Sequence, residues 1–514
     1  MADGMISTGW IARVPGTALA ALLAALLGGC GRAPEEAPPL QVGFTDSRDL
    51  EQATDEATGL GLTRRDARGR VVSGLAQSWR ISNDGSFAIF RLRPILAAGG
   101  RAVEASDVVR ALEGAVRSPG HAAARDLLGG AIDVRAPLPE VIEIRLTTPQ
   151  PELPDLLALP EMAIRPTGSG RRRTPRLPGP LMEAEPAESE GKGRDRAPAH
   201  SLLVPDPGFG LAENAMPEAG VKLLRLDPEP AVALFLEGRL DLVVGGLMRG
   251  LDDAARIPER QGLVVVPARA VARLAVNQSA GPLADRRVRQ ALAMAVDREG
   301  LAEAFGAPAT RPLAGLIPPM ISGRAVADEP ESSRAALAGR QEEARQRLAE
   351  AGHGPGAEAL RLRLAAGRSR EETRLIEKLA NDWAQIGVEV VAERRSVDGL
   401  RKAIEAGQIE LALELVESPV DAPTLFLSRL PCGRNRLGIC LPEADKLWQA
   451  SWTAPTLAER LAAVEAAHRL WLDDAAMIPL FQPARWWLVS PRIANWAPGV
   501  DSVHGLAHIR RDQR

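Results

Sequence analysis

The stretch that decides the fold is Val276–Glu299, which reads VNQSAGPLADRRVRQALAMAVDRE. The apolar run that ends before Asn277 predicts a strand, Gly281-Pro282 predicts a turn, and Asp285 is suited to cap a helix. Apolar residues between Val288 and Val296 recur at helical spacing, which predicts one buried face. The side chains expected to face water are those of Arg286, Arg287, Gln290 and Arg298.

Several positions in this stretch together resemble the signature of the family 5 extracellular solute-binding proteins, the peptide- and nickel-binding lipoproteins of ABC importers. They are Asn277, Pro282, Asp285, Val288 to Leu292 and Ala295 to Arg298. A second match is Gly74-Leu75-Ala76 followed by Ser78-Trp79. The resemblance implies an α/β chain with a two-lobed fold like that of type II periplasmic binding proteins. It also implies a small subdomain inserted in the first lobe.

Length and composition agree with a large globular protein. The chain has 514 residues, of which 45% are hydrophobic and 25% are charged, and this length suits about three domains of roughly 150 residues each. The net charge of −3 provides no general attraction for nucleic acid, so we expect no nucleic-acid partner.

The amino terminus has the features of a secretory signal. An apolar stretch, residues 18–27, is too short to span a membrane stably and ends in Leu27-Gly28-Gly29-Cys30. That ending resembles a lipobox, which implies that residues 1–29 are removed and Cys30 is lipidated. Residues 30–39, rich in proline and glutamate, then form a tether. The alternative is a plain signal peptide with an incidental cysteine.

Cys432 and Cys440 are the other two cysteines, eight positions apart. An oxidising compartment favours a disulfide between them. A metal site there is less consistent with the sequence, because no histidine or further cysteine stands nearby. We therefore predict no metal and no cofactor.

The order of apolar runs along the chain suggests a domain layout. We expect residues 40–272 to form lobe 1, residues 273–480 lobe 2, and residues 481–514 a return to lobe 1, with the interlobe crossing near Val271–Val276. Residues 167–207 contain almost no apolar periodicity and predict a flexible loop. A contact of the basic run 171–176 with anionic lipid or nucleic acid is the alternative, and a solvated loop is favoured because acidic residues soon balance the charge.

Lobe 2 contains the pattern of a strand, a helix and a second strand. Leu375, Leu379 and Trp383 form a helical stripe that Gly387 closes. Alternating apolar residues on either side of the helix predict strands at 360–364 and 388–391. The expected parallel partner of these strands is the run 409–416.

Ligand chemistry is expected directly after that strand, where peptide-binding members of the family carry an acid that pairs with the ligand's amino terminus. Asp421 fits the second acid of the motif, whereas Ser418 occupies the place of the first and Glu417 stands one residue early. A carboxylate in a closed cleft is the partner that a buried ammonium needs. Glu417 supplies it if the loop shifts by one residue, and it is then expected to matter more than Asp421. The alternative makes Glu417 a solvated loop acid and Asp421 a turn or cap residue.

Trp486 and Trp487 stand on the strand that resembles the family's return to lobe 1. Adjacent residues of a strand point to opposite faces, so one indole can contact ligand while the other packs in the core. Burial of both is the alternative.

Enzyme signatures are lacking: no phosphate-binding loop, nucleophile elbow or His-Glu-x-x-His zinc motif occurs in the sequence. His504 and His508 have helical spacing, but no acid or thiol cluster accompanies them, and we interpret them as part of a surface tail. We predict that the chain is not an enzyme.

The resemblance implies a substrate-binding lipoprotein of an ABC importer. Such a protein would capture a peptide-like or other small polar solute in an interlobe cleft and deliver it to a membrane permease. It would act as a monomer, lipid-anchored on the periplasmic side of the cell envelope. The altered acid motif leaves an alternative, a binding-impaired family member that serves as an envelope adaptor or interaction lipoprotein.

Overall fold

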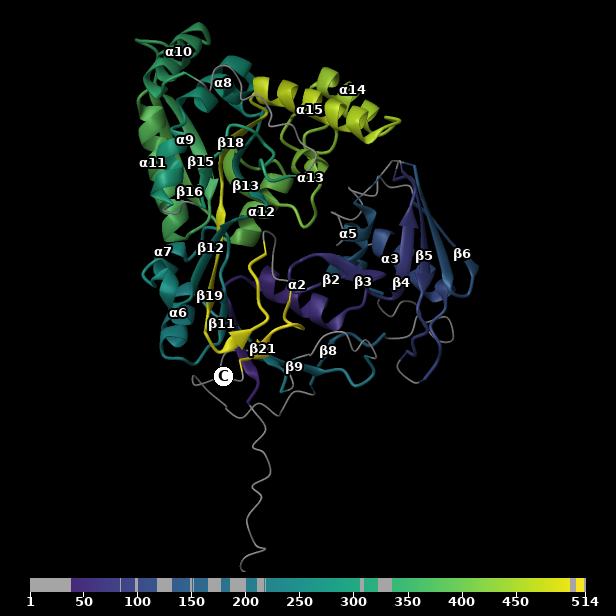
Figure 1. Ribbon diagram of the computed structural model, residues 1–514. Helices are drawn as coiled ribbons and strands as arrows, with labels where there is room; N and C mark the ends of the chain where they lie inside the picture. The colour runs from purple at the N-terminus through teal and green to yellow at the C-terminus, as the bar shows by residue number, and fades with distance from the viewer. Residues whose placement is uncertain are drawn as a thin grey trace, which may run out of the picture. The chain divides into compact units, whose positions relative to one another are not determined.

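The structure is a computed structural model, and Figure 1 shows the arrangement of its elements. It describes residues 38–83, 85–97, 100–117, 132–147, 150, 152–164, 177–184, 200–209, 217, 219–305, 309–321, 335–499 and 505–512. The chain divides into Met1–Pro38 and a compact unit, Pro39–Arg514. The predicted signal peptide, Cys30 and the tether up to residue 37 lie outside the described residues.

The deciding stretch folds as its sequence predicts. Strand β13 (Ala270–Val276) leads through the 3₁₀ turn η4 (Gly281–Ala284) into helix α8 (Arg286–Ala295). The carboxylate of Asp285 accepts a hydrogen bond from the backbone N–H of Arg287 at 2.8 Å, so the predicted N-cap is confirmed. Val288 and Leu292 are fully buried on the predicted face.

One expectation for this stretch is wrong, because Arg298 does not face water. It begins helix α9 (Arg298–Ala304) and is 9% exposed. Its guanidinium donates hydrogen bonds to the Pro479 carbonyl at 2.9 Å and the Ala293 carbonyl at 3.1 Å. Backbone carbonyls that satisfy a guanidinium allow an arginine to be buried, and the apolar period of the sequence does not reveal them.

The first large sheet has seven strands in the order β12-β19-β11-β1-β10-β9-β8. Their bounds are β1 (Leu40–Phe44), β8 (Leu181–Glu183), β9 (His200–Pro205), β10 (Val221–Arg225), β11 (Leu242–Val244), β12 (Leu263–Pro267) and β19 (Ala484–Val489). Helix α2 (Ser47–Thr58) packs in a cluster with β1. Helices α6 (Pro228–Leu236) and α7 (Leu251–Ala254) pack in a second cluster with β11 and β19. We use the name first lobe for this sheet and its helices together with the four-stranded sheet that is described later in this subsection.

The second lobe is built on a six-stranded sheet in the order β14-β18-β13-β17-β15-β16. The strands besides β13 are β14 (Arg311–Pro312), β15 (Leu360–Ala366), β16 (Val388–Arg394), β17 (Leu411–Glu417) and β18 (Met477–Gln482). β15 pairs in parallel with both β16 and β17, so the predicted strand-helix-strand unit and its parallel partner are confirmed.

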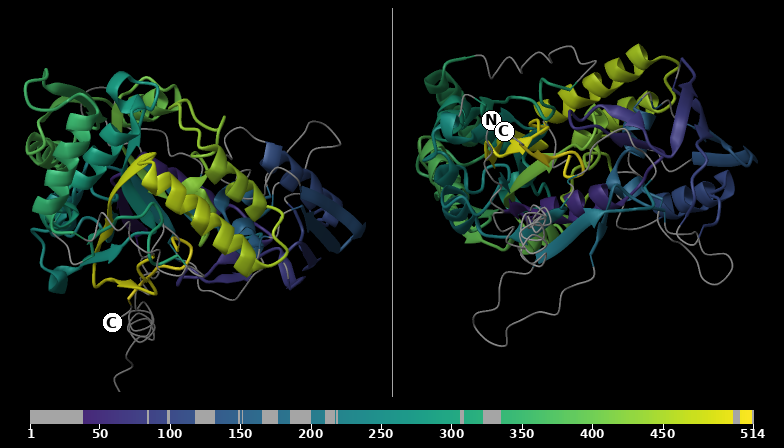
Figure 2. Two further views of the ribbon diagram at one scale, coloured as in Figure 1. Left: turned by 90° about the horizontal axis from the view of Figure 1, so that it is seen from above. Right: turned by 60° about the horizontal axis from the view of Figure 1, so that its bottom comes forward.

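Helices cover both faces of this second sheet, as Figures 1 and 2 show. Helices α8, α9, α10 (Leu337–Glu350) and α11 (Arg370–Ala384) supply one apolar cluster. Helices α12 (Val397–Glu405), α13 (Pro423–Leu427), α14 (Pro442–Ser451) and α15 (Leu457–Asp473) supply the other. Trp383 on α11 is fully buried and its indole donates to the Leu292 carbonyl at 3.0 Å, which ties α11 to α8.

Two segments carry the chain between the large sheets. β12 continues into β13 across residues 268–269, and β18 continues into β19 across Pro483. The two segments touch, because the Ala268 N–H donates to the Pro483 carbonyl at 2.9 Å and the Gln482 amide donates to the Ala268 carbonyl at 2.8 Å. The sequence predicted the first crossing near Val271–Val276. In the structure it lies slightly earlier in the chain, at residues 268–269.

A four-stranded sheet follows β1 and α2 in the chain, in the order β4-β5-β7-β6. Its elements are β4 (Ala76–Ile81), β5 (Phe87–Leu92), α3 (Ala105–Arg117), β6 (Ile132–Leu138), β7 (Val141–Leu146) and α5 (Leu153–Leu157). The hairpin β2 (Thr63–Arg65) and β3 (Val71–Ser73) precedes it. Its core also contains Val420 and Ala422, which come from the loop after β17 in the second lobe.

The segment predicted as a flexible loop, 167–207, contains two strands in its described part. β8 pairs with β9 and β9 with β10, which extends the first sheet at one edge. Leu181 and Leu203 are fully buried there. The prediction was wrong for residues 181–183 and 200–205, because apolar runs this short among prolines and charges give no detectable period.

The carboxyl-terminal part adds a short ribbon of β20 (Ile493–Ala494) and β21 (Arg510–Arg511). The remaining described elements are the 3₁₀ turns η1 (Pro160–Met162) and η3 (Glu259–Gln261). A helix long and apolar enough to cross a membrane does not occur among the residues that the structure describes.

Candidate functional site

Arg485 links the two lobes close to the crossing strands. It stands on β19, three residues after Gln482, and its Nη2 donates to both carboxylate oxygens of Glu417 at 2.9 Å. Its Nη1 donates to the carboxylate of Asp49 on α2 at 2.8 Å. Glu417 ends β17 in the second lobe, whereas Asp49 and Arg485 belong to the first. One guanidinium therefore pairs with a carboxylate from each lobe.

Burial makes this ion triad strong. Arg485 is 1% exposed and Asp49 is 6% exposed. Burial alone opposes the charge on Arg485, but Glu417 and Asp49 outweigh it and raise the pKa of the guanidinium. Burial raises the pKa of the Asp49 carboxyl, and the charge of Arg485 opposes that rise. Removal of Arg485 would leave both acids without their shared counter-charge.

Glu417 was predicted as the partner of a ligand's ammonium group, and in the structure its carboxylate pairs with Arg485. Its Ser418 neighbour, at the place of the family's first acid, donates its hydroxyl to the Val420 carbonyl at 2.6 Å. The Ser418 N–H donates to the Arg269 carbonyl of the crossing segment at 3.0 Å. This part of the motif therefore holds the turn after β17 in place.

Asp421, the second predicted acid, lies in a different environment. It is half-buried in the loop that packs on the four-stranded sheet. Its charge acts on Glu152, which stands at the N-cap position of helix α5 in the first lobe. Arg460 on α15 of the second lobe also acts on Glu152, and its Nη2 lies 3.3 Å from the Gln150 side-chain oxygen. Acids from both lobes are therefore close enough to interact electrostatically, and Arg460, which is 3% exposed, opposes them.

Glu152 is the perturbed member of this group. Burial raises the pKa of its carboxyl, the charge of Arg460 opposes the rise, and the charge of Asp421 adds to it. Oε2 of Glu152 is shielded from solvent and has no hydrogen-bond partner in the described part of the chain. A carboxylate with unused acceptor capacity beside a second acid is suited to an amine or another hydrogen-bond donor.

Trp486 and Trp487 were predicted as ligand contacts, and the structure buries both. Trp486 is fully buried among α6, α7 and β11, and its indole donates to the Arg249 carbonyl at 3.0 Å. Trp487 is 3% exposed and packs edge-on against Trp496 at 5.8 Å between ring centroids. The two rings lie on opposite faces of β19, as the alternation of a strand requires. Both are packing residues in this structure, because each face of β19 packs against an apolar cluster that encloses one of the two indoles.

A further set of contacts joins the lobes through α7 and α11. Both terminal nitrogens of Arg374 donate to the carboxylate of Asp252 at 2.9 Å. The Glu371 carboxylate accepts from the N–H of Gly250 at 2.9 Å. Gly250 has φ of 75°, in the left-handed region, and this conformation turns its N–H toward α11.

The loop between α13 and α14 contains the predicted pair of cysteines. Cys432 and Cys440 are joined by a disulfide with a Cα–Cα distance of 4.4 Å. Asn435 organises the loop between them by donating to the Ile439 carbonyl and accepting from the Leu437 and Ile439 N–H groups.

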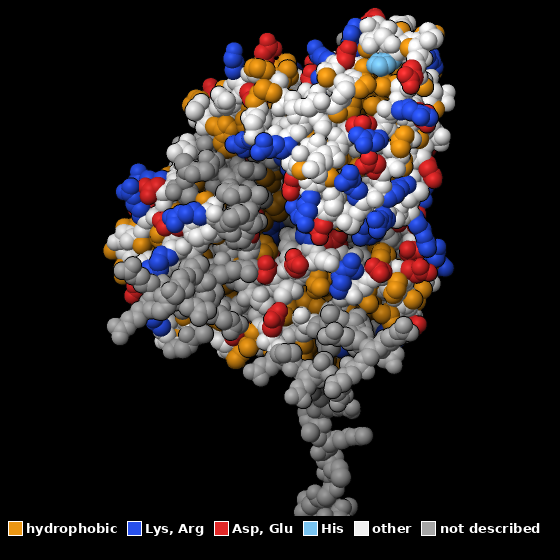
Figure 3. Space-filling model, turned by 180° about the vertical axis from the view of Figure 1, so that it is seen from behind, with side chains coloured by type: hydrophobic (Ala, Val, Ile, Leu, Met, Phe, Trp, Pro, Cys, Tyr) orange, Lys and Arg blue, Asp and Glu red, His pale blue; other side chains and the backbone are white. Residues whose placement is uncertain are grey.

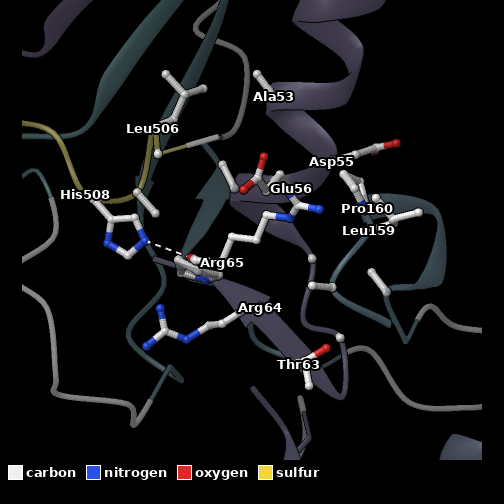
Figure 4. Close-up of a pocket in the computed structure, with 18 residues that line it drawn as sticks. Ala53, Asp55, Glu56, Thr63, Arg64, Arg65, Leu159, Pro160, Leu506 and His508 are labelled. Atoms are coloured by element: carbon white, nitrogen blue, oxygen red, sulfur yellow. Dashed lines mark hydrogen bonds between the residues drawn. The ribbon is translucent and has the colours of Figure 1, made fainter. Parts of the chain in front are cut away.

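A pocket of the first lobe, drawn in Figure 4, lies among α2, β2, the segment 158–163 and the carboxyl-terminal segment 505–508. Nε2 of His508 lies 3.3 Å from the Arg65 carbonyl oxygen. The Arg65 guanidinium donates to the Pro419 carbonyl at 2.8 Å. His508 is 6% exposed, so its assignment to a surface tail was wrong; His504 lies outside the described residues. The tail is held by contacts that helical spacing does not predict.

Charged side chains on the molecular surface give no support for a nucleic-acid site on the face shown in Figure 3. Basic and acidic side chains alternate there without separating into areas of one sign. Within the described ranges no group of three histidines, cysteines or acids is arranged to hold a metal ion.

Sequence reasoning missed three of these residues: Asp49, Arg485 and Glu152. Arg485 had a detectable signal, because it is the charged residue within the otherwise apolar run Ala484–Val489. A charge inside a buried strand needs a partner. No local pattern identified Asp49 or Glu152, whose partners lie hundreds of residues away.

The fold defines a class of protein: two α/β lobes joined by crossing strands, as in type II periplasmic binding proteins. OppA of Burkholderia pseudomallei superposes with a TM-score of 0.77 at 22% identity, covering 93% of this chain and 100% of that one. The Escherichia coli murein tripeptide-binding protein MppA gives a TM-score of 0.73 at 20% identity, covering 89% and 95%. Both predictions of fold class and of two lobes are confirmed.

Sequence comparison gives matches to the family that the sequence resembles. Residues 220–434 match the middle region of the family 5 bacterial extracellular solute-binding proteins. Di/tripeptide-binding protein 2 of Pseudomonas aeruginosa is 23% identical over 478 residues, covering 86% of this chain and 87% of that protein. The murein peptide-binding protein MppA of Escherichia coli is 24% identical over 492 residues, covering 88% and 86%.

These matches support the resemblance to the family 5 solute-binding proteins and show it to be a divergent one, at about 23% identity. Members of this family are non-enzymatic binding proteins of ABC transporters, so the prediction that the chain is not an enzyme is confirmed. Membership supports a substrate-binding role outside the cytoplasm.

The raised pKa of Glu152 predicts a pH-dependent effect of Glu152→Gln. An acid whose folded pKa is raised contributes stability that is fully present below the unfolded pKa and is lost as pH rises through the folded pKa. The glutamine variant has no such loss, so its melting temperature relative to the natural protein should rise between pH 4 and pH 8. Differential scanning fluorimetry across this range measures the difference.

Glu358→Gln, at an exposed acid of the second lobe, is the matched control and should show no comparable rise. If the melting temperature of Glu152→Gln relative to the natural protein stays constant or falls toward pH 8, the pKa of the Glu152 carboxyl is not raised by burial.

Proposed function

We propose that the chain is the substrate-binding lipoprotein of an ABC importer. It captures a peptide-like or other small polar solute between its lobes and delivers it to a membrane permease. It acts as a monomer, anchored through Cys30 on the periplasmic side of the cell envelope. The relatives named above carry di-, tri- or murein-peptide binding in their names, which supports a peptide-like solute.

The observation that carries the proposal is that Asp421 of the second lobe acts electrostatically on the buried carboxyl of Glu152 in the first, whose Oε2 has no hydrogen-bond partner in the described part of the chain. Asp421 stands directly before α13 in the second lobe, and Glu152 directly before α5 in the first. A ligand amine bound between them would contact both lobes and so favour the arrangement in which they approach. Its positive charge would also favour the ionised form of Glu152, which burial disfavours. We therefore assign amine recognition to Asp421 with Glu152.

Arg485 changes the role of Glu417 in this proposal. An ammonium at Glu417 would have to compete with a bidentate guanidinium at 2.9 Å. Charge-assisted bidentate pairs are among the stronger polar contacts in proteins. We therefore place Glu417 in the connection between the lobes and Asp421 in ligand contact, which reverses the order of importance expected from the sequence.

The pairing of Arg485 with Glu417 also supports the second candidate, a binding-impaired adaptor or interaction lipoprotein. Arg485 neutralises the carboxylate nearest the family's acid position, and Ser418 replaces the first acid itself. A member that has lost amine recognition would keep the crossing strands and cores as a scaffold. The two candidates differ in whether the purified protein binds a small solute.

Solute binding is tested by native mass spectrometry and thermal shift with di- and tripeptides, nickel chelates and opine-like acids. For an amine ligand found in this way, Asp421→Asn should weaken binding by about tenfold or more, because a charge-assisted bond is lost. Glu417→Gln should weaken it less, and isothermal titration calorimetry measures both.

Asp398→Asn, at a strongly exposed acid of α12, is the control and should bind like the natural protein. Absence of any ligand across the panel would favour the adaptor. Equal loss in Glu417→Gln and Asp421→Asn would remove the assignment of amine recognition to Asp421.

Lipid anchoring has its own test, because Cys30 stands at the lipobox-like sequence Leu27-Gly28-Gly29-Cys30. Cys30→Ser should move the protein from the membrane fraction to the soluble fraction of cells, since no thiol remains to be acylated. Cell fractionation with immunoblotting detects the change. A Cys30→Ser protein that stays with the membrane would refute the anchor.

A further inference from the structure

A second pocket lies within the second lobe, apart from the crossing strands. Helices α8, α9 and α10 and the chain from the end of α15 into β18 surround it, and Figure 1 shows these helices gathered at one end of the six-stranded sheet. Its volume is about 250 Å³, below the roughly 300–1,000 Å³ of pockets for drug-sized ligands. The pocket therefore suits a small molecule.

Four arginines line this pocket against one acid. They are Arg286, Arg298, Arg340 and Arg347, and the acid is Asp473. Glu343 pairs with Arg347 at 2.8 Å from the outer side, and Asp382 adds a negative charge near Arg340. Asp474 also lies 3.9 Å from Nε of Arg286. Among the residues that line the pocket, four arginines still stand against one acid. Such a concentration of guanidinium groups attracts anions.

Backbone carbonyls hold these arginines in place. Arg298 donates to the Pro479 carbonyl at 2.9 Å, and Arg340 donates to the Val296 carbonyl at 3.2 Å. Arg286 donates to the Asp473 carbonyl at 3.1 Å. For Arg340, a carbonyl fixes the position of the guanidinium without neutralising its charge. The site is therefore built before any anion arrives, which lowers the entropic cost of binding.

Arg340 is the residue that most needs an acceptor. It is 9% exposed, and its Nε is shielded from solvent, so this nitrogen is not reached from the pocket. Of its terminal nitrogens, Nη1 donates to the Val296 carbonyl at 3.2 Å, and Nη2 makes no hydrogen bond within the described part of the chain. An oxyanion accepts from two such donors at once, in the bidentate arrangement that arginine favours.

The rest of the lining is apolar apart from Gln290, which bonds Arg347 and the Asp473 carbonyl. Met294, Leu472, Met477 and Pro479 face the same pocket as the arginines. A ligand that placed only a charge there would leave this surface against water, whereas an attached apolar group would cover it. The lining therefore selects a molecule with an anionic end and a short apolar part.

We propose that this pocket is a second binding site, for a small molecule with a phosphate or carboxylate group and a short apolar portion. It is separate from the amine site at Asp421 and does not depend on it. The four arginines bind the oxyanion, and the methionines, Leu472 and Pro479 contact the apolar portion.

The test measures binding of phenyl phosphate, phenylacetate and inorganic phosphate to the full chain by isothermal titration calorimetry at constant ionic strength. Phenyl phosphate or phenylacetate should bind saturably, and the tighter of the two shows which oxyanion the pocket favours. Inorganic phosphate should bind more weakly than phenyl phosphate, because it lacks the apolar part. Arg340→Gln should weaken the tighter probe by about tenfold or more, the effect of losing one charge-assisted pair.

Arg347→Gln provides a second variant at a more exposed position, should Arg340→Gln fail to fold. Arg361→Gln, on an exposed position of β15 outside the pocket, is the matched control and should bind like the natural protein. The proposal is overturned if no probe binds saturably to the natural protein, or if the pocket variants and the control bind equally. Since Asp421→Asn leaves this pocket intact, failure here is distinct from failure of the amine site.

Discussion

The buried guanidinium of Arg485 is the interaction on which the joining of the lobes depends. It lies where two chain segments cross between the sheets, and it bonds Asp49 from one lobe and Glu417 from the other. A buried arginine needs a carboxylate partner, because an unpaired buried charge costs about 3–5 kcal/mol. The crossing segments supply the covalent connection, and the triad adds an electrostatic one at the same place.

Because Arg485 pairs with Glu417, we assign ligand recognition to residues other than Glu417. Family resemblance directs attention to the turn after β17, but there Glu417 is committed to Arg485 and Ser418 holds the turn. Asp421 lies a few residues further on, and its charge acts on the buried carboxyl of Glu152 from the first lobe. A solute amine between them would join the lobes at a second place, so ligand binding and lobe contact become one process.

The sequence predicted the scaffold well and the site only in part. Local signals, such as the Asp285 cap and the apolar stripe of α11, depend on residues close together in the sequence, and the structure confirms them. Strands β8 and β9 were not predicted, because their apolar runs are short. The site depends on partners remote in the chain: Arg485 lies 436 positions from Asp49. Periodicity does not encode such pairs, so Glu417 was assigned to a ligand and Glu152 was not noticed.

The central claim is that Glu417 and Arg485 act on each other and not independently. A double-mutant cycle of Glu417→Gln and Arg485→Met, followed by urea unfolding, measures their coupling directly. The loss in the double variant should be smaller than the sum of the single losses by about 2 kcal/mol or more, as for partners in one buried network. Additivity within about 0.5 kcal/mol would contradict the claim.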